Sequence, residues 1–163
     1  PDRDEPHLGA DDNASGVAAL LEAARTLAGK REALKRDVIV LAFTAEETGV
    51  LGSTHYAKNP TPAPVKDMVA MLNLDMVGRL RADRLAILGG DSATEWAELA
   101  RPACEAAGLE CSTSGDGYGP SDQTPFYAAG VPVLHFFTGA HGDYHKPSDS
   151  ADKQNAIGLS PPL

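Results

Sequence analysis

Residues 38–47 read VIVLAFTAEE, a run of six apolar residues that ends close to the paired carboxylates of Glu46 and Glu47. A continuous apolar run between polar flanks is typical of a buried strand, which we expect over residues 37–44. Two like charges at the end of such a strand cost free energy unless a cation or a shared proton offsets their repulsion. The pair therefore indicates a site where one carboxylate binds a metal ion and the other is free to act as a base.

Helical and strand patterns alternate along the rest of the chain. Apolar residues spaced three and four apart predict helices, and continuous apolar runs predict buried strands. This alternation predicts an α/β domain with a largely parallel sheet covered by helices on both faces. The expected helices span residues 14–30, 49–58, 93–107 and 124–129, and the expected strands span residues 37–44, 68–75, 85–88 and 131–137.

The composition fits one folded domain and excludes several classes of protein. The 163 residues are 42% hydrophobic and 23% charged, which allows a buried core and argues against disorder. The net charge of −9 disfavours a nucleic-acid partner, because phosphate backbones are bound by clustered Lys and Arg. The sequence contains no run near the roughly 20 apolar residues of a membrane-spanning helix, and no signal peptide is recognisable in it.

Cys104 and Cys111 are the two cysteines of the chain. Their number and spacing suit neither a disulfide framework nor a CxxC metal site. We therefore expect both to be unpaired structural residues.

Four segments carry acidic or histidine side chains near predicted strand ends or before the first helix. Ligands of open α/β sheets collect at the carboxyl ends of the strands, so these side chains are expected to meet there. Carboxylates combined with an imidazole are typical of a catalytic zinc, manganese or cobalt site, whereas structural zinc sites are rich in thiolates. The segments are GADDNASG (9–16), AEETGVLGS (45–53), NLDMVG (73–78) and DYHKPSD (143–149).

Each segment alone also has a simpler interpretation. Asp11 or Asp12 would cap the helix that follows, Asp75 would cap a loop, and a lone loop histidine such as His145 would be solvated. The joint occurrence of all four segments favours the metal site.

Together, the four segments resemble the motifs of the zinc aminopeptidases of peptidase family M28, and they occur in the same order from about Leu8 to Asn155. The resemblance implies a three-layer α/β/α sandwich with a mostly parallel, mixed central sheet. Residues 1–163 would then be a single catalytic domain that is incomplete and truncated at both ends. The implied activity is that of a metal-dependent exopeptidase, which removes N-terminal residues from peptides through a metal-activated water.

The resemblance also implies roles for individual residues. Asp11 would bridge two zinc ions, Glu47 and His145 would complete one metal site, and Asp75 would belong to the other. Glu46, which binds no metal, would be the general base that takes a proton from the water and passes it to the departing amine.

Further family features fall on neighbouring residues. A cis peptide bond is implied between Asp11 and Asp12. Tyr118 matches a position whose hydroxyl would stabilise the oxyanion, although it could equally be an aromatic residue packed over a loop. Gln123 replaces the usual histidine of a Ser-Asp-His motif, which affects contacts around the metal ligands rather than the ligands themselves. Three apolar residues could line a specificity pocket or belong to the core: Met76, Phe136 and Phe137.

One ligand of the family pattern, a histidine in an upstream His-x-Asp motif, has no counterpart in this sequence. His7 is the only histidine before Asp11, and we expect it to face solvent. We therefore expect one zinc ion to bind well and a second to bind weakly or not at all. Exposed sheet edges would favour self-association. Family members are commonly exported, which implies a periplasmic or extracellular location.

Two alternatives to the aminopeptidase remain open. A transferase similar to glutaminyl cyclase uses the same fold with one zinc ion held by Asp, Glu and His. A non-catalytic binding ectodomain uses the fold after losing its ligands. The intact GADDNASG motif favours a peptidase over the first, and retention of Glu46, Glu47, Asp75 and His145 argues against the second.

Overall fold

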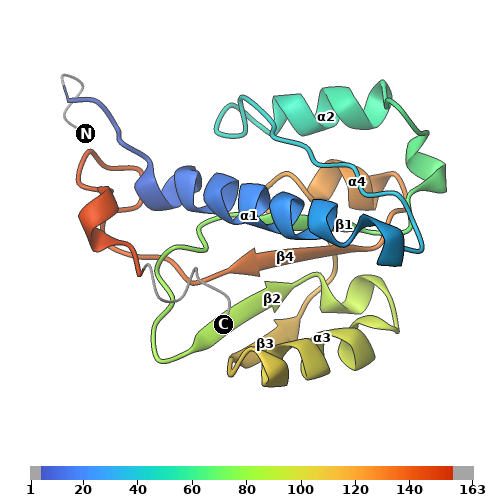
Figure 1. Cartoon of the computed structure of the whole chain (residues 1–163). Helices are drawn as coiled ribbons and strands as arrows, with labels where there is room; N and C mark the ends of the chain where they lie inside the picture. Colours follow the sequence, from blue (N-terminus) through green and yellow to red (C-terminus); the bar gives the residue numbers. More distant parts are fainter. Residues whose placement is uncertain (1–4, 156–163) are drawn as a thin grey trace.

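A computed structural model describes residues 5–155 as a four-stranded sheet flanked by helices (Figure 1). The strands are β1 (Met71–Leu74), β2 (Arg84–Leu88), β3 (Glu110–Ser114) and β4 (Val133–Phe137). Their order is β1-β4-β2-β3. β1 and β4 are parallel, β2 and β3 are parallel, and β2 and β4 are antiparallel. The predicted mixed, mostly parallel sheet is thus confirmed. The domain expected over 1–163 also includes residues 1–4 and 156–163, which lie outside the described part.

Four α-helices surround the sheet close to where the apolar spacing predicts them. Shorter helical turns connect them, and the turn at Ala10–Ser15 leads directly into the first helix. α1 packs beside β1, and α3 lies beside β3 at the opposite edge of the sheet (Figure 1). The helices are α1 (Gly16–Gly29), α2 (Leu51–Lys58), α3 (Trp96–Ala106) and α4 (Thr124–Ala128).

The core consists of two apolar clusters on opposite faces of the sheet. Successive residues of a strand point to opposite faces, so the buried pair Val133 and Leu134 on β4 serves one cluster each. Leu134 packs with Trp96 and other residues of α3, whereas Val133 packs with Phe126 of α4. The sheet is therefore covered on both faces, which makes the three-layer α/β/α sandwich.

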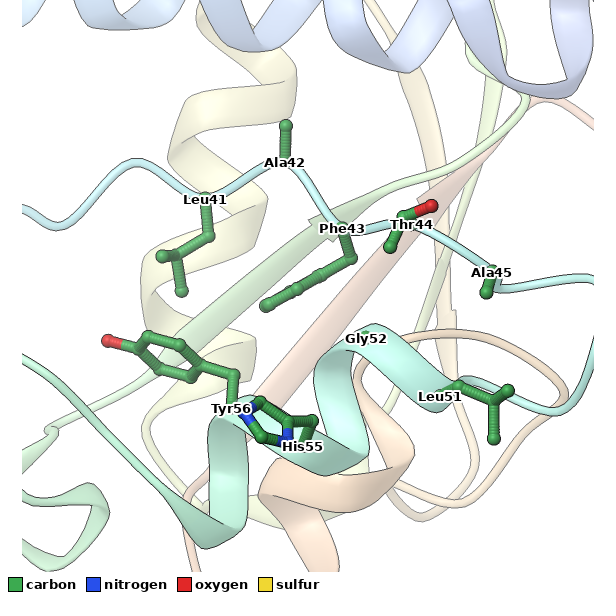
Figure 2. A pocket seen from close by; sticks show the side chains of 9 residues that line it. All are labelled: Leu41, Ala42, Phe43, Thr44, Ala45, Leu51, Gly52, His55 and Tyr56. Carbon is green, nitrogen blue, oxygen red and sulfur yellow. The ribbon is translucent and has the colours of Figure 1, made fainter.

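The predicted strand at 37–44 is not a strand in the structure. No described segment pairs with it, and its side chains alternate between half-buried and exposed positions. Figure 2 shows Leu41 and Phe43 pointing toward Tyr56 of α2, whereas Ala42 points away. Val38 and Val40 remain 51% and 45% exposed. The apolar run thus buries one face only. It does not form a strand, because a strand also needs a hydrogen-bonded neighbour, which hydrophobicity alone does not supply.

The region after α3 contains one strand that the sequence did not predict and one expectation that is wrong. Residues 110–114 form β3, although their composition is mostly polar, because this strand lies at the sheet edge and is largely exposed. Cys104 at the end of α3 and Cys111 in β3 form a disulfide, with their Cα atoms 6.1 Å apart. The pairing of α3 with β3 brings the two cysteines together, and the sequence spacing alone did not reveal this packing.

The helices in residues 5–155 are all too short or too polar to cross a membrane.

Candidate metal centre

The four acidic or histidine-bearing segments converge where β1 and β4 end. These strands are parallel, so their carboxyl ends lie at the same edge of the sheet. Asp75 follows β1 directly, and its backbone N–H donates to the carbonyl of Phe136 on β4. His145 lies in the loop after β4, and Asp12 lies in the turn before α1. Glu46 and Glu47 lie in a turn that precedes α2.

Asp12, Glu47 and His145 form the one group of three potential metal ligands within residues 5–155. One ligand atom from each lies within 4.8 Å of the others. His145 Nε2 is 2.9 Å from a Glu47 oxygen and 3.1 Å from an Asp12 oxygen. The imidazole therefore bridges two carboxylates that belong to distant parts of the sequence.

The turn that carries Asp12 is tied to the end of β1 by its neighbour Asn13. The Asn13 side chain donates to the Leu74 carbonyl at 2.9 Å and accepts from the N–H groups of Met76 at 3.2 Å and Gly16 at 3.0 Å. Gly16 leaves no room for a Cβ, because that atom would overlap the Asn13 side chain. These contacts hold the Asp12 turn against the strand that ends at Asp75.

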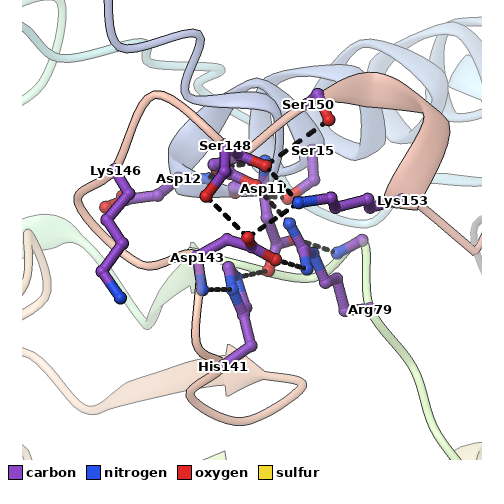
Figure 3. A network of polar contacts seen from close by, with 12 residues as sticks. Asp11, Asp12, Ser15, Arg79, His141, Asp143, Lys146, Ser148, Ser150 and Lys153 are labelled. Atoms are coloured by element: carbon purple, nitrogen blue, oxygen red, sulfur yellow. Dashed lines mark hydrogen bonds and ion pairs between the residues drawn. The ribbon is translucent and has the colours of Figure 1, made fainter.

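The structure does not bring Asp11 to this group, although the sequence favoured it as the bridging ligand. The Asp11 side chain is fully buried, accepts from the Gly78 N–H at 2.7 Å and lies 3.0 Å from His141 Nε2 (Figure 3). Asp12, next in the sequence, faces Glu47 and His145 instead. Motif spacing could not distinguish two adjacent aspartates whose side chains point in different directions.

The cis peptide bond is also displaced by one residue from its predicted position. It joins Asp12 to Asn13 rather than Asp11 to Asp12. The residue that precedes the cis bond is thus the one that faces Glu47 and His145.

Glu46 is half-buried beside this group. Burial, followed by the charges of Asp75, Glu47, Asp122 and Asp12, raises the pKa of its carboxyl to about 7. A carboxyl group with such a pKa can both accept and release a proton near neutral pH.

Asp12 experiences the same electrostatic crowding. Burial, followed by the charges of Glu47 and Asp75, raises the pKa of the Asp12 carboxyl to about 6, and the His145 charge opposes this rise. A divalent cation would relieve the repulsion among these acids, so the donor set fits a metal ion.

Asp75 is oriented by a buried polar cluster. Its carboxylate accepts a hydrogen bond from Ser121 Oγ at 2.8 Å. The Asn73 side chain in β1 donates to Ser121 Oγ at 2.8 Å and to the side-chain Oε1 of Gln123 at 3.0 Å. Gln123 stands where the resemblance to family M28 implies a histidine. It contacts Asn73, which holds Ser121, and Ser121 in turn donates to Asp75.

Tyr118 and Tyr144 differ in their contacts. Tyr118 is 61% exposed, and its ring packs edge-on against Tyr127 at 4.8 Å. Tyr144 stacks on the His145 ring at 3.7 Å. Burial, followed by the charges of Asp12 and nearby acids, raises the pKa of the Tyr144 phenol. Sequence reasoning missed Tyr144, and its adjacency to His145 was the available signal.

The remaining residues singled out in the sequence are not members of the group of three ligands. His7 is exposed, Met76 is buried, and Phe136 packs against the cluster around α3. Phe137 packs near His135, with ring centroids 5.9 Å apart. An apolar cavity of about 460 Å³ lies between residues 41–45 and α2, and neither Glu46 nor the three ligands line it (Figure 2).

The sequence of this chain was compared with models of protein families and with known proteins. Residues 2–159 match the model of peptidase family M28. The chain is 36% identical over 154 residues to aminopeptidase YwaD of Bacillus subtilis, an alignment that covers 88% of this chain and 33% of YwaD. The chain therefore spans about a third of the length of this curated relative.

Solved structures share the fold. The zinc aminopeptidase BSAP from Bacillus subtilis superposes with a TM-score of 0.74 and 32% identity, over 94% of this chain and 39% of that chain. The glutaminyl cyclase of Porphyromonas gingivalis superposes with a TM-score of 0.67 over 94% of this chain and 62% of that chain, but at 21% identity this likeness concerns the fold alone. From the family-model match and the identity to YwaD, the chain belongs to peptidase family M28.

Proposed function

We propose that this chain carries the catalytic site of a zinc-dependent aminopeptidase, which removes N-terminal residues from peptides. The observation that carries the proposal is the convergence of Asp12, Glu47 and His145 within 4.8 Å, with Glu46 beside them. Family membership and the names of the relatives, an aminopeptidase and a zinc aminopeptidase, support it.

Asp12, Glu47 and His145 would hold the zinc ion. Carboxylate oxygens and imidazole nitrogens are both ligands of catalytic zinc, and three protein ligands leave one position open. Bound there, zinc would act as a Lewis acid on the peptide carbonyl and lower the pKa of the attacking water. Asp12 would take the bridging role that the family resemblance implies for Asp11, and Asp75 would belong to a second site.

Zinc is expected to bind this chain with a stoichiometry near one. The described residues supply one group of three ligands, and Asp75 is not part of it. Two equally tight ions in a titration of the metal-free chain would contradict this expectation.

Glu46 is the proposed general base. Glu46 is not one of the three proposed ligands, so its carboxylate would be free to take a proton from the attacking water and return it to the departing amine. Tyr118 remains the proposed oxyanion donor from the family pattern. Its exposed ring would have to turn its hydroxyl toward the carbonyl oxygen of the substrate.

Hydrolysis of aminoacyl-p-nitroanilides with added zinc tests the proposal. Glu46→Gln is expected to lower kcat by about 10²–10⁴-fold with zinc still bound, because the variant cannot accept the proton. Glu98→Gln, an exposed change on α3, is the matched control and should leave kcat unchanged.

The same assay separates the alternatives. Cyclisation of N-terminal glutamine without release of nitroaniline would favour the transferase, which also uses one Asp-Glu-His zinc site. If zinc-loaded protein hydrolyses no peptide and Glu46→Gln changes nothing, the binding ectodomain is favoured.

We also propose that the protein acts in the periplasm or outside the cell. The Cys104–Cys111 disulfide supports this location, because such bonds persist in oxidising compartments. Cell fractionation followed by immunodetection tests it, and recovery of the protein in the cytosolic fraction would contradict it.

A further inference from the structure

Arg79 is a buried cation held between two carboxylates of the loop that follows β4. Its Nη1 lies 2.8 Å from Asp143 Oδ2 (Figure 3), and its Nη2 lies 2.6 Å from Asp149 Oδ1. The Arg79 side chain is only 10% exposed and that of Asp149 only 2%. Such pairs in a dry environment are strongly directional, so Arg79 fixes how this loop lies on the end of β1.

The Asp149 carboxylate connects Arg79 to the turn that carries Asp12. Its second oxygen accepts from the backbone N–H groups of Asp11 at 2.8 Å and Asp12 at 3.0 Å. One carboxylate therefore lies between the Arg79 guanidinium and the backbone of a proposed zinc ligand.

The Asp143 carboxylate connects Arg79 to the rest of the loop that carries His145. Its second oxygen accepts from Ser148 Oγ at 2.7 Å and Lys153 Nζ at 2.7 Å. The Asp143 N–H donates to His141 Nδ1 at 3.2 Å, and His141 Nε2 contacts the buried Asp11 carboxylate. Residues 141–153 are thus held at both sides of His145.

We propose that Arg79 is a positioning residue that sets the placement of Asp12 relative to His145, and thereby the affinity of the zinc site. The inference rests on the proposed function, because the ligands are those of the proposed zinc site. Arg79 itself touches neither Asp12 nor His145 through its side chain in the contacts described. It acts through Asp149 on one side and Asp143 on the other.

Lysine cannot replace arginine in this position without a loss. The planar guanidinium offers two Nη groups in fixed directions, whereas an ammonium group is a single point charge on a flexible stem. Arg79→Lys therefore keeps the charge but cannot hold both carboxylates in their present positions. This makes it a milder test than removal of the charge.

Two measurements on the full chain test the proposal. The first is zinc affinity by competition with a chromogenic chelator, where Arg79→Lys is expected to weaken binding by about 10–100-fold. The second is hydrogen exchange of the Asp11 and Asp12 amides in metal-free protein. Both amides should exchange faster in Arg79→Lys, because Asp149 is no longer held.

Two matched controls separate positioning from general stability. Arg84→Lys changes an exposed ion pair with Glu110, and Ile87→Val loosens the core without touching this network. Both controls should retain the zinc affinity of the unmodified chain. If Ile87→Val weakens zinc binding as much as Arg79→Lys does, the proposal is overturned, because loss of stability would then be sufficient.

Unchanged zinc affinity and unchanged amide exchange in Arg79→Lys would also overturn the proposal. If Arg79→Lys does not fold, Asp143→Asn releases the side of Arg79 that faces the loop of His145, at a more exposed position. Asp149 still holds the Asp11 and Asp12 amides in this variant, so zinc affinity decides, and an unchanged affinity would overturn the proposal. If the unmodified chain binds no zinc, the proposed function fails, and the exchange of the Asp11 and Asp12 amides alone decides whether Arg79 positions the turn.

Discussion

At the scale of single residues, the fold places several carboxylates so close together that, without a metal ion, their repulsion destabilises the ionised forms of Glu46 and Asp12. The pKa values of Glu46 and Asp12 are raised to about 7 and about 6, so both carboxyls prefer the protonated state more in the folded than in the unfolded chain. These two groups therefore bind more protons in the folded than in the unfolded chain between pH 4 and 7, and their contribution to stability falls as the pH rises through this window.

The metal-free chain should consequently melt at a higher temperature at pH 5 than at pH 8. For Glu46 the effect is on the order of 1 kcal/mol once solvent screening is allowed for. Glu46→Gln should remove part of the pH dependence, and Glu98→Gln should retain all of it. Calorimetry from pH 5 to 8 in chelator checks this, and equal pH dependence in the two variants would disprove it.

Asp11 and Asp12 should respond in opposite ways to the same substitution. Asp12→Asn should weaken zinc binding and stabilise the metal-free chain, because it removes a repelled carboxylate. Asp11→Asn should cost about 2 kcal/mol of stability, because the buried carboxylate accepts from the Gly78 N–H and contacts His141. Urea denaturation and zinc titration of both variants check this, and zinc loss from Asp11→Asn alone would return the ligand role to Asp11.

The sequence could identify which segments meet at the candidate metal centre, but not which side chain of each segment belongs to it. Glu47 and His145 lie together as their segments suggested. The choice between Asp11 and Asp12 depended on the direction of each side chain, which the tertiary contacts of Asn13 and Asp149 determine. The same holds for Arg79, whose partners are 64 and 70 residues away in the sequence.

At the scale of elements, apolar periodicity predicted the helices well and the strands unevenly. The spacing of apolar residues in α1 and α3 is a local property, so their positions followed from the sequence. A strand also depends on its neighbour. Residues 37–44 are apolar yet unpaired among the described residues, whereas β3 is polar yet pairs with β2 in five register positions from Arg84 to Leu88.

The disulfide between α3 and β3 makes a testable contribution at this scale. Cys104 and Cys111 close a short loop, and the loss of chain entropy in the unfolded state predicts a stabilisation of about 2–3 kcal/mol. Urea denaturation with and without reductant should show this difference. The double variant Cys104→Ala, Cys111→Ala should not respond to reductant. If the unmodified chain does not respond either, the cysteines are unpaired, as the sequence suggested.

At the scale of the whole molecule, the parallel pair of β1 and β4 explains how distant segments form one site. The carboxyl ends of both strands lie at one edge, so Asp75 and the loop of His145 emerge side by side. The Asp12 turn is tied to this edge through Asn13 and Asp149. The candidate ligands therefore lie where the rule for ligands in open α/β sheets expects a site, although the rule says nothing about individual ligands.

The exposed apolar surface around β1 leads to a prediction about association. β1 is an edge strand in the described sheet, and Val69 and Leu72 are 54% and 56% exposed. Unpaired strand edges with apolar side chains favour pairing between chains. We expect self-association that increases with concentration and is reduced by Leu72→Lys.

Leu99→Lys on α3, a similarly exposed leucine away from the sheet edge, is the control and should not reduce self-association. Sedimentation velocity over a concentration series measures both, and a monomer at all concentrations, or an equal effect of the two substitutions, would show that the β1 edge is not the contact.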